Sequence, residues 1–249
     1  MMGEKLAVMV ETKTFITQGI VLRASDYQDS NMIVSIFTKE FGLISAKLKG
    51  AKNKNTKYKF ATLPFCFAQF ELSVFGDKFN IESATEIENF FKITLDYEKY
   101  VFGSAILEMV GAIALSVEEN GVLYSALIKA LHTLCFTQLN PCVVFVRFAL
   151  GIFKITGYEF NPYCIHCGQV LSNCFWEHKS GALVCGDCAG FGDRKVSPSL
   201  FEAMSTMVKG DFDKLEGVGE FDEHEAIELV QKNCELHYFK TLNSLKQLL

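Results

Sequence analysis

Four cysteines in two C-x-x-C pairs are the residues whose types and spacing indicate chemistry most clearly. Cys164 and Cys167 form the first pair, Cys185 and Cys188 form the second, and 17 residues separate the two pairs. A C-x-x-C turn directs two thiolates at one point, and structural zinc is held by four such ligands in a tetrahedron. The spacing therefore predicts one structural zinc ion. Its closed shell leaves no position for a water molecule, so we expect no catalytic role for the metal.

The segment between the pairs is predicted to be a hairpin that completes this site. Residues 175–179 and 182–184 have the composition of short strands, and Ser180-Gly181 supplies the turn. A redox dithiol is the alternative, but a thioredoxin-like site would use one pair opening a helix after a strand. His166 and Cys174 lie within the same region. Because four thiolates already fill the shell, we expect both residues to lie outside it.

A run of lysines at residues 47–59 is the second chemically suggestive feature, with six lysines and no acidic residue. Apolar and polar residues alternate through the strand that begins the run, which places its lysines on the solvent face. A mobile, positively charged loop follows. Such a surface suits a phosphate backbone, although a loop kept soluble by its charge is the alternative. The candidate DNA-binding residues are Lys47, Lys49, Lys52, Lys54, Lys57 and Lys59.

Aromatic residues and charge distribution bear on the same question. Phe65 and Phe67 follow the basic run and are either stacking platforms for bases or buried core residues. Residues 1–80 carry a net charge of +4, whereas residues 81–249 carry −9. We therefore expect only the amino-terminal part to meet a polyanion.

Signatures of bond-breaking chemistry are missing from the sequence. It has no G-x-x-x-x-G-K-[ST] phosphate loop, no H-E-x-x-H and no G-x-S-x-G. Carboxylates are frequent between residues 211 and 228, but they resemble a solvated loop and the start of a helix. We assign no catalytic residue and no nucleotide cofactor, and expect that the protein is not an enzyme.

The nine cysteines and the hydropathy pattern indicate a cytoplasmic location. The cysteine count is odd, so at least one thiol cannot be in an intramolecular disulfide. A secreted protein would have to account for that thiol, whereas a reduced cytosolic protein would not. No signal-peptide pattern or uncharged stretch of membrane-spanning length is present, so we expect no membrane association.

Hydrophobic periodicity predicts an α+β protein of two domains. The first, residues 1–87, is predicted to be a five-stranded barrel of the oligonucleotide-binding (OB) type, and a plain antiparallel sheet packed on helices is the alternative. The second, residues 88–249, is predicted to be a helical bundle with the zinc-binding insert at residues 158–192. The expected strands are 16–23, 32–38, 43–50, 63–75 and 78–85. The expected helices are 100–119, 123–137, 141–157, a short helix from Ser197-Pro198, and 225–249.

The order of these features resembles the RecO family of bacterial recombination mediator proteins. The resemblance rests on Thr17-Gln-Gly-Ile-Val-Leu-Arg23, Asp26-Tyr27, Lys49-Gly50-Ala51-Lys52, Leu63-Pro64-Phe65 and the two cysteine pairs, and extends over residues 15–249. The family's basic loop usually carries Arg and a Ser-Arg step, whereas Asn53, Asn55 and Thr56-Lys57 stand in those places here. Residues 1–14 look like an extension.

The resemblance implies a role in DNA repair and homologous recombination. RecO proteins bind single- and double-stranded DNA, anneal complementary strands without ATP, and act with RecR. Together they help RecA to replace single-strand-binding protein (SSB), whose acidic C-terminal tail docks on the helical region in some members. The expected location is then the cytoplasm, with nucleoid association during repair. Two rival functions are a zinc-ribbon RNA-binding accessory protein of transcription or translation, and a metal-dependent nuclease.

Overall fold

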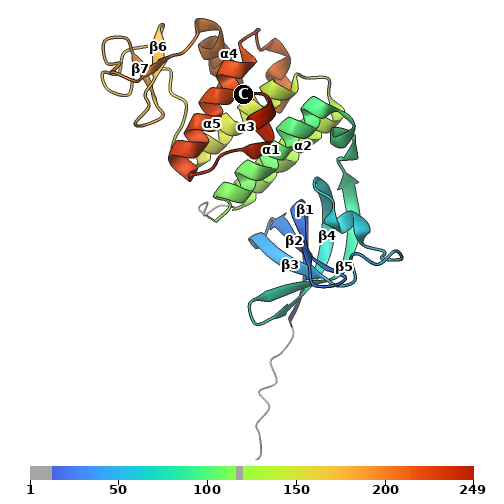
Figure 1. Ribbon diagram of the computed structural model, residues 1–249. Coiled ribbons are helices and arrows are strands. Elements are labelled where there is room, and N and C mark those ends of the chain that lie inside the picture. The colour runs from blue at the N-terminus through green and yellow to red at the C-terminus, as the bar shows by residue number, and fades with distance from the viewer. Residues whose placement is uncertain (1–12, 116–119) are drawn as a thin grey trace, which may run out of the picture. The chain divides into compact units, whose positions relative to one another are not determined.

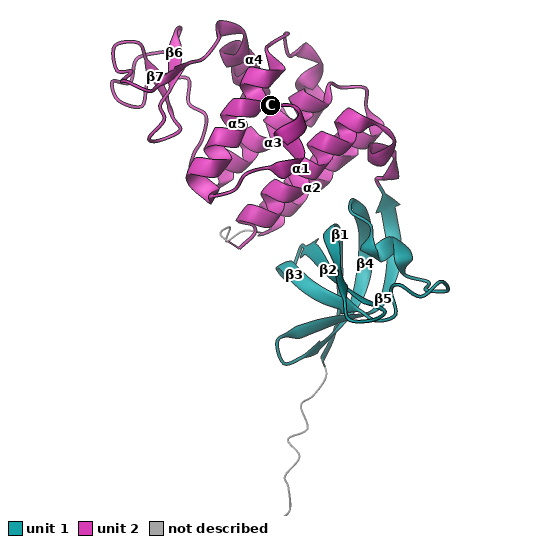
Figure 2. Cartoon of the chain, in the orientation of Figure 1, with its two compact units in different colours: residues 1–89 teal, residues 90–249 magenta. Residues whose placement is uncertain are grey.

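The computed structural model describes residues 13–115 and 120–249 and divides the chain into two compact units (Figures 1 and 2). The first unit contains residues 1–89 and the second contains residues 90–249. The predicted amino-terminal extension lies almost wholly outside the described residues. Among the helices of the described residues, none is long and apolar enough to cross a membrane.

The first unit is a closed five-stranded barrel, as predicted. Its strands follow the order β1-β2-β3-β5-β4, and β1 closes the barrel by pairing with both β2 and β4. All neighbouring strands are antiparallel except β3 and β5, which are parallel. The α+β prediction with an OB-type barrel is therefore confirmed. The strands are β1 (Lys13–Tyr27), β2 (Asn31–Thr38), β3 (Gly42–Leu48), β4 (Cys66–Phe75) and β5 (Lys78–Asn89).

Alternation along β3 shows how the barrel separates its core from its surface. Ile44, Ala46 and Leu48 are buried in the core, whereas Ser45 is exposed and Lys47 is half-buried. The period of two predicted from the sequence is therefore present. Strand β4 begins three residues later than predicted because the residue before it, Phe65, has a left-handed φ of 69°.

The loop between β3 and β4, which carries the predicted basic segment, packs against the barrel at both of its ends. Ala51 and Ala61 are buried in the barrel core, and Tyr58 packs against it. A short 3₁₀ helix, η1 (Lys59–Thr62), leads to β4. The basic segment is thus held at both ends by apolar contacts.

The second unit begins with three helices that pack on one another. Asp96 caps α1 through the backbone N–H of Lys99. Asn140 caps α3, whose first residue is Pro141. Helix α3 is buried along most of its length and contacts both other helices. The elements are η2 (Phe91–Leu95), α1 (Tyr97–Ile113), α2 (Asn120–Phe136) and α3 (Pro141–Ile155). Helix α1 ends earlier than the predicted residue 119, because residues 114 and 115 already form a turn.

The predicted single helix at residues 225–249 is wrong. Helix α5 (Glu223–Tyr238) ends because Phe239 adopts a left-handed φ of 52°. The chain then turns back onto α1 and forms the 3₁₀ helix η4 (Asn243–Gln247). At the start of η4, the backbone N–H groups of residues 243 and 244 donate hydrogen bonds to the Glu108 carboxylate at 2.7 and 3.1 Å. Leu242 and Leu245 are fully buried. The helix-like spacing of apolar residues therefore continues past the end of α5, although the chain is no longer in that helix.

Two further helical segments complete this unit. Helix α4 (Pro198–Lys209) is capped by the Ser197 hydroxyl as predicted, through the N–H of Leu200. The following connection contains the 3₁₀ helix η3 (Phe212–Gly217).

Candidate metal centre and nucleic-acid interface

The cysteine-rich insert folds as a small three-stranded sheet that carries two knuckles. Its strands are β6 (Cys174–Trp176), β7 (Leu183–Cys185) and β8 (Arg194–Lys195), in the order β7-β6-β8. Gly181, with a φ of 71°, makes the turn between β6 and β7. In the first knuckle, the Gly168 N–H donates to the Cys164 carbonyl at 2.9 Å. These local turns aim two pairs of thiols at one another.

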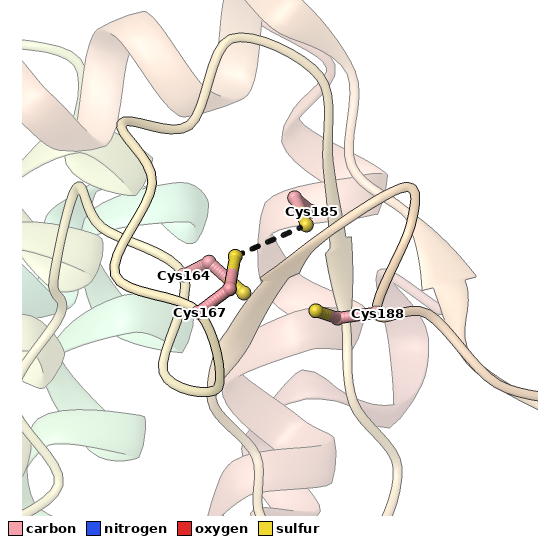
Figure 3. Close-up of side chains that lie close together, drawn as sticks. All are labelled: Cys164, Cys167, Cys185 and Cys188. Atoms are coloured by element: carbon pink, nitrogen blue, oxygen red, sulfur yellow. Dashed lines mark hydrogen bonds between the residues drawn. The ribbon is translucent and has the colours of Figure 1, made fainter.

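The four predicted ligands form one cluster. The Sγ atoms of Cys164, Cys167, Cys185 and Cys188 all lie within 4.8 Å of one another, and those of Cys167 and Cys185 are 3.6 Å apart (Figure 3). In a tetrahedral site with Zn–S bonds of about 2.3 Å, sulfur atoms are about 3.8 Å apart. The cluster could therefore hold a metal ion, and four thiols are a ligand set that suits zinc.

Hydrogen bonds and burial shift the pKa values of the thiols in this cluster. Burial raises the pKa of Cys164, but hydrogen bonds from the backbone of Cys167, Cys185 and His166 outweigh it and lower that pKa to about 6. A side-chain hydrogen bond to Cys185, together with burial, raises the pKa of Cys188 to about 12. These backbone hydrogen bonds favour the thiolate form of Cys164, which is the form that binds a metal ion.

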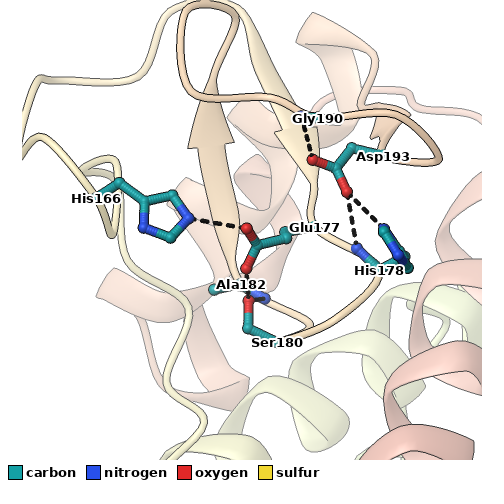
Figure 4. A network of polar contacts seen from close by, with 7 residues as sticks. All are labelled: His166, Glu177, His178, Ser180, Ala182, Gly190 and Asp193. Carbon is teal, nitrogen blue, oxygen red and sulfur yellow. Dashed lines mark hydrogen bonds and ion pairs between the residues drawn. The ribbon is translucent and has the colours of Figure 1, made fainter.

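Two carboxylates brace the loops around the cluster (Figure 4). Glu177 Oε1 lies 2.8 Å from His166 Nε2, and this hydrogen bond raises the pKa of His166. Asp193 accepts hydrogen bonds from the Gly190 N–H at 2.7 Å and from the backbone N–H and ring Nδ1 of His178. The Gly190 hydrogen bond is the largest cause that lowers the pKa of Asp193 to about 2. Both loops are therefore held by side chains that lie outside the cluster.

Cys174 is a neighbour of the cluster and not a member of it. It lies opposite Cys185 in the β6–β7 register and is buried. Burial raises the pKa of its thiol to about 11. Cys174 therefore stays protonated and behaves as a small core residue.

A hollow of about 610 Å³ crosses the outer face of the barrel at β3 and β5. Lys47 and Lys49 line it, together with Lys78 from the start of β5. Its aromatic residues include Tyr27, which is 40% exposed, and Phe75, which is 56% exposed. The Lys47 ammonium lies 5.4 Å from the centre of the Tyr27 ring. Positive charge and aromatic surface thus meet at one place.

The other four predicted lysines lie in the loop that continues from Lys49. The N–H of Lys52 donates to the carbonyl of Ser30, and its ammonium pairs with Asp26 at 2.7 Å. Lys54, Lys57 and Lys59 are exposed and form no ion pair within the described part of the chain. The six lysines are therefore divided between the hollow and this loop.

Three side chains of the hollow, those of Tyr27, Phe75 and Lys78, were not among the predicted site residues. Of the two aromatic residues predicted to be either stacking platforms or core residues, Phe65 is buried and Phe67 is half-buried. Phe65 is only 1% exposed and cannot receive a base. Tyr27, Phe75 and Lys78 lie instead beside the β1–β2 and β4–β5 turns. These residues could have been found from the predicted fold, because an OB barrel brings the β1–β2 and β4–β5 turns to the same edge.

A second hollow, of about 400 Å³, lies on the helical unit between α2, α3 and η3. It combines two cations with an apolar lining. Lys129 pairs with Asp211 at 2.5 Å, and the Arg147 guanidinium lies 5.4 Å from the centre of the Phe212 ring. The Arg147 Nε also donates to the Gly210 carbonyl at 3.0 Å. Two cations and the Asp211 carboxylate thus line this hollow, which leaves one positive charge in excess within an acidic unit.

Comparison with known proteins matches both units to one family. The family model for the N-terminal part of recombination protein O matches residues 10–90, and the model for its C-terminal part matches residues 94–246. DNA repair protein RecO of Clostridium acetobutylicum is 26% identical over 236 residues, covering 93% of this chain and 95% of its own length. RecO of Acetivibrio thermocellus is 24% identical over 245 residues, covering 92% and 98%. RecO of Thermobifida fusca is 26% identical over 234 residues, covering 92% and 96%.

Proposed function

The chain belongs to the RecO family, and from this membership we propose that it acts in DNA repair as a DNA-binding recombination mediator. The observation that carries the proposal is the hollow on the barrel, where Lys47, Lys49 and Lys78 surround exposed aromatic side chains. Lysines neutralise backbone phosphates, and aromatic rings receive bases of any sequence. The site therefore suits DNA binding without sequence preference.

The proposed activity is the annealing of complementary strands without a nucleotide. Two DNA strands repel each other through their phosphates, and lysines that neutralise those charges reduce the repulsion. No covalent bond is made or broken, so this function needs no catalytic residue. With RecR as its partner, the protein would then help RecA to load onto single-stranded DNA coated with SSB.

A structural zinc ion is part of this proposal, with Cys164, Cys167, Cys185 and Cys188 as its ligands. Bound there, the metal supplies a crosslink between the two knuckles. Around it, Glu177 and Asp193 hold the loops. Because each element of the sheet is only two or three residues long, the insert has little other internal support.

The hollow on the helical unit is the proposed docking place for the SSB tail. An acidic peptide with an apolar end needs cations beside an apolar surface, and Lys129 and Arg147 lie beside Val122, Ile155 and Phe212. Replacing Lys129 by Glu reverses one charge at an exposed position. This variant should weaken binding of an SSB tail peptide at least tenfold without changing DNA binding. If wild type and the Lys129→Glu variant bound the peptide equally, the SSB tail would have to dock outside this hollow.

Strand annealing tests the proposed function as a whole. Complementary oligonucleotides, bare or coated with SSB, are mixed with the metal-loaded protein in the absence of nucleotide, and duplex formation is followed by fluorescence. We expect annealing to be faster than in the protein-free control on both substrates. Intact strands after incubation with magnesium would separate this activity from a nuclease. No acceleration, or tighter binding to RNA in a competition assay, would favour the RNA-binding alternative.

A further inference from the structure

We propose that a cavity between the cysteine-rich insert and helices α3, α4 and α5 is a docking site for an uncharged, aliphatic segment of a protein partner. The segment inserts one aliphatic side chain, and its backbone carbonyl accepts a hydrogen bond from the indole N–H of Trp176. The cavity has a volume of about 120 Å³. This inference is independent of DNA binding, because the described residues that line the cavity all belong to the helical unit.

The walls of the cavity are predominantly apolar. The three helices contribute side chains that include Leu150, Met204 and Leu229, and β7 of the insert contributes Leu183. Such walls favour an apolar ligand in proportion to the area that it removes from water. The volume sets the size of that ligand, because an engineered apolar cavity of about 150 Å³ holds a benzene ring. The cavity therefore accepts one side chain and is too small for a nucleotide or a cofactor.

One polar group in the wall of the cavity has no partner. Trp176 lines the cavity and is only 7% exposed, and its indole Nε1–H has no hydrogen-bond acceptor among the described residues. A buried donor that stays unpaired is unfavourable, and the N–H of a buried tryptophan usually has a partner. A peptide segment that places a backbone carbonyl in the cavity supplies the missing acceptor. This donor, together with the apolar walls, indicates that the cavity is a binding site.

The rim of the cavity has the composition of a protein interface. Tyr158, Tyr163 and Ile165 line the cavity and are 46%, 50% and 58% exposed. Tyrosine is enriched in protein interfaces, where a ring of contacts surrounds a central buried anchor. The Tyr158 ring is held by the His237 ring, which stacks on it with the ring centres 3.6 Å apart. This part of the rim is therefore preformed, which lowers the entropic cost of docking.

The charges around the cavity exclude an acidic tail as its ligand. Glu159 is the only carboxylate or cation among the described residues that line the cavity, and Lys154 pairs with it at 2.9 Å. Lys232, whose ammonium lies 5.9 Å from the centre of the Trp176 ring, is paired with Glu228 at 3.0 Å. Neither lysine is therefore free to receive a carboxylate. The docking segment is thus uncharged at its anchor, unlike the acidic peptide proposed for the hollow between α2, α3 and η3.

The test uses the fluorescence of Trp176, the only tryptophan of the chain, to report binding in this cavity. The metal-loaded full-length protein is titrated with N-acetyl-leucinamide, which joins an aliphatic side chain to two carbonyl groups. The comparison probes are N-acetyl-glycinamide, which has no side chain, and the amide of N-acetyl-aspartate, which carries a carboxylate. We expect a saturable change with the leucine probe, with a dissociation constant in the millimolar range that about a dozen non-hydrogen atoms allow. The other two probes should bind at least about tenfold more weakly.

Ala182→Leu should abolish the response to the leucine probe, because Ala182 lines the cavity and the larger side chain fills it. Val170→Leu is the matched control, since it adds bulk to the insert at a position that is 72% exposed and outside the lining, and it should bind like wild type. Trp176→Phe keeps a ring but removes the donor, and should weaken binding measured by calorimetry by about five- to tenfold. Metal content and strand annealing should be unchanged in Ala182→Leu, so this inference can fail while the proposed function stands. No fluorescence change in wild type, equal binding of the three probes, or full binding by a folded Ala182→Leu variant would overturn the inference.

Discussion

Replacing Lys54, Lys57 and Lys59 by Ala should flatten the salt dependence of single-strand binding by about 2 units. Each phosphate neutralised on single-stranded DNA contributes a slope of about −0.7 in log affinity against log salt. The three side chains are exposed and form no ion pair within the described residues, so each is available to one phosphate. Three such contacts correspond to a slope of about −2. Folding stability should change little, because exposed substitutions usually stay within about 0.5 kcal/mol.

The ion pair between Lys52 and Asp26 sharpens this prediction. At 2.7 Å from the carboxylate, the Lys52 ammonium already has a partner, so we expect it to contribute less than the other loop lysines. Asp26→Asn removes that partner. This variant should bind DNA more tightly and steepen the slope by up to about 0.7, because one more lysine becomes available.

Anisotropy titrations between 50 and 200 mM salt, a range over which such contacts change affinity strongly, would measure these slopes. The matched control removes three exposed lysines from the helical unit, namely Lys209, Lys214 and Lys246, and so makes the same change in net charge. It should leave the slope near that of wild type. An unchanged slope in a folded loop variant, or an equal change in the control, would refute the assignment of the loop to phosphate binding.

Three further predictions concern the helical unit. Cys188→Ser should lower the metal content, measured by atomic emission, from one ion per chain to near zero. It should also destabilise the insert, since structural zinc contributes on the order of 10 kcal/mol in small isolated sites. Full metal occupancy after removing Cys185 as well would contradict the site. The folded pKa of Asp193, about 2, lies below its unfolded value, so its stabilising effect is complete above about pH 4 and disappears as the pH falls to 2. The stability advantage of wild type over Asp193→Asn should therefore shrink across that interval in acid unfolding, and a constant difference would exclude this role. Glu108→Ala removes the carboxylate that receives three hydrogen bonds from residues 243 and 244, so thermal unfolding should show a loss of about 2–3 kcal/mol, and an unchanged melting temperature would show that the tail is held by its leucines alone.

Local patterns were sufficient to predict the barrel strands and the cysteine cluster. The alternation around Lys47 specified which face of β3 is solvated, because successive side chains of a strand point to opposite sides. The two C-x-x-C pairs required only a hairpin of suitable length between them. Both features depend on residues that are near one another in the sequence, and the structure places them as that reasoning predicts.

Features that depend on distant residues could not be predicted in this way. Leu242 and Leu245 have the spacing of a helix, but they are buried after a turn at Phe239, a residue type that rarely adopts a positive φ. The Glu108 carboxylate that holds this tail lies more than 130 residues earlier in the chain. Tyr27 and Phe75 likewise have no periodic signal, since only closure of the barrel brings their two turns together.

Annealing without a nucleotide limits how firmly the hollow can hold a strand. Stacking on an aromatic ring contributes about 1–3 kcal/mol per base, so two exposed rings retain a strand by about 2–6 kcal/mol. Each base-pair step of a duplex contributes about 1.4 kcal/mol on average, so about two to five steps outweigh both rings. At the upper bound of about 6 kcal/mol about five steps are needed, and a short nucleus of paired bases of that length can therefore draw the strand out of the hollow. A third ring would shift this balance: Ser45→Trp adds one at an exposed position that lines the hollow. This variant should bind oligothymidine about tenfold more tightly and yet anneal complementary strands more slowly, as measured by anisotropy and stopped-flow fluorescence. If annealing instead accelerates together with affinity, release from the hollow does not limit the reaction.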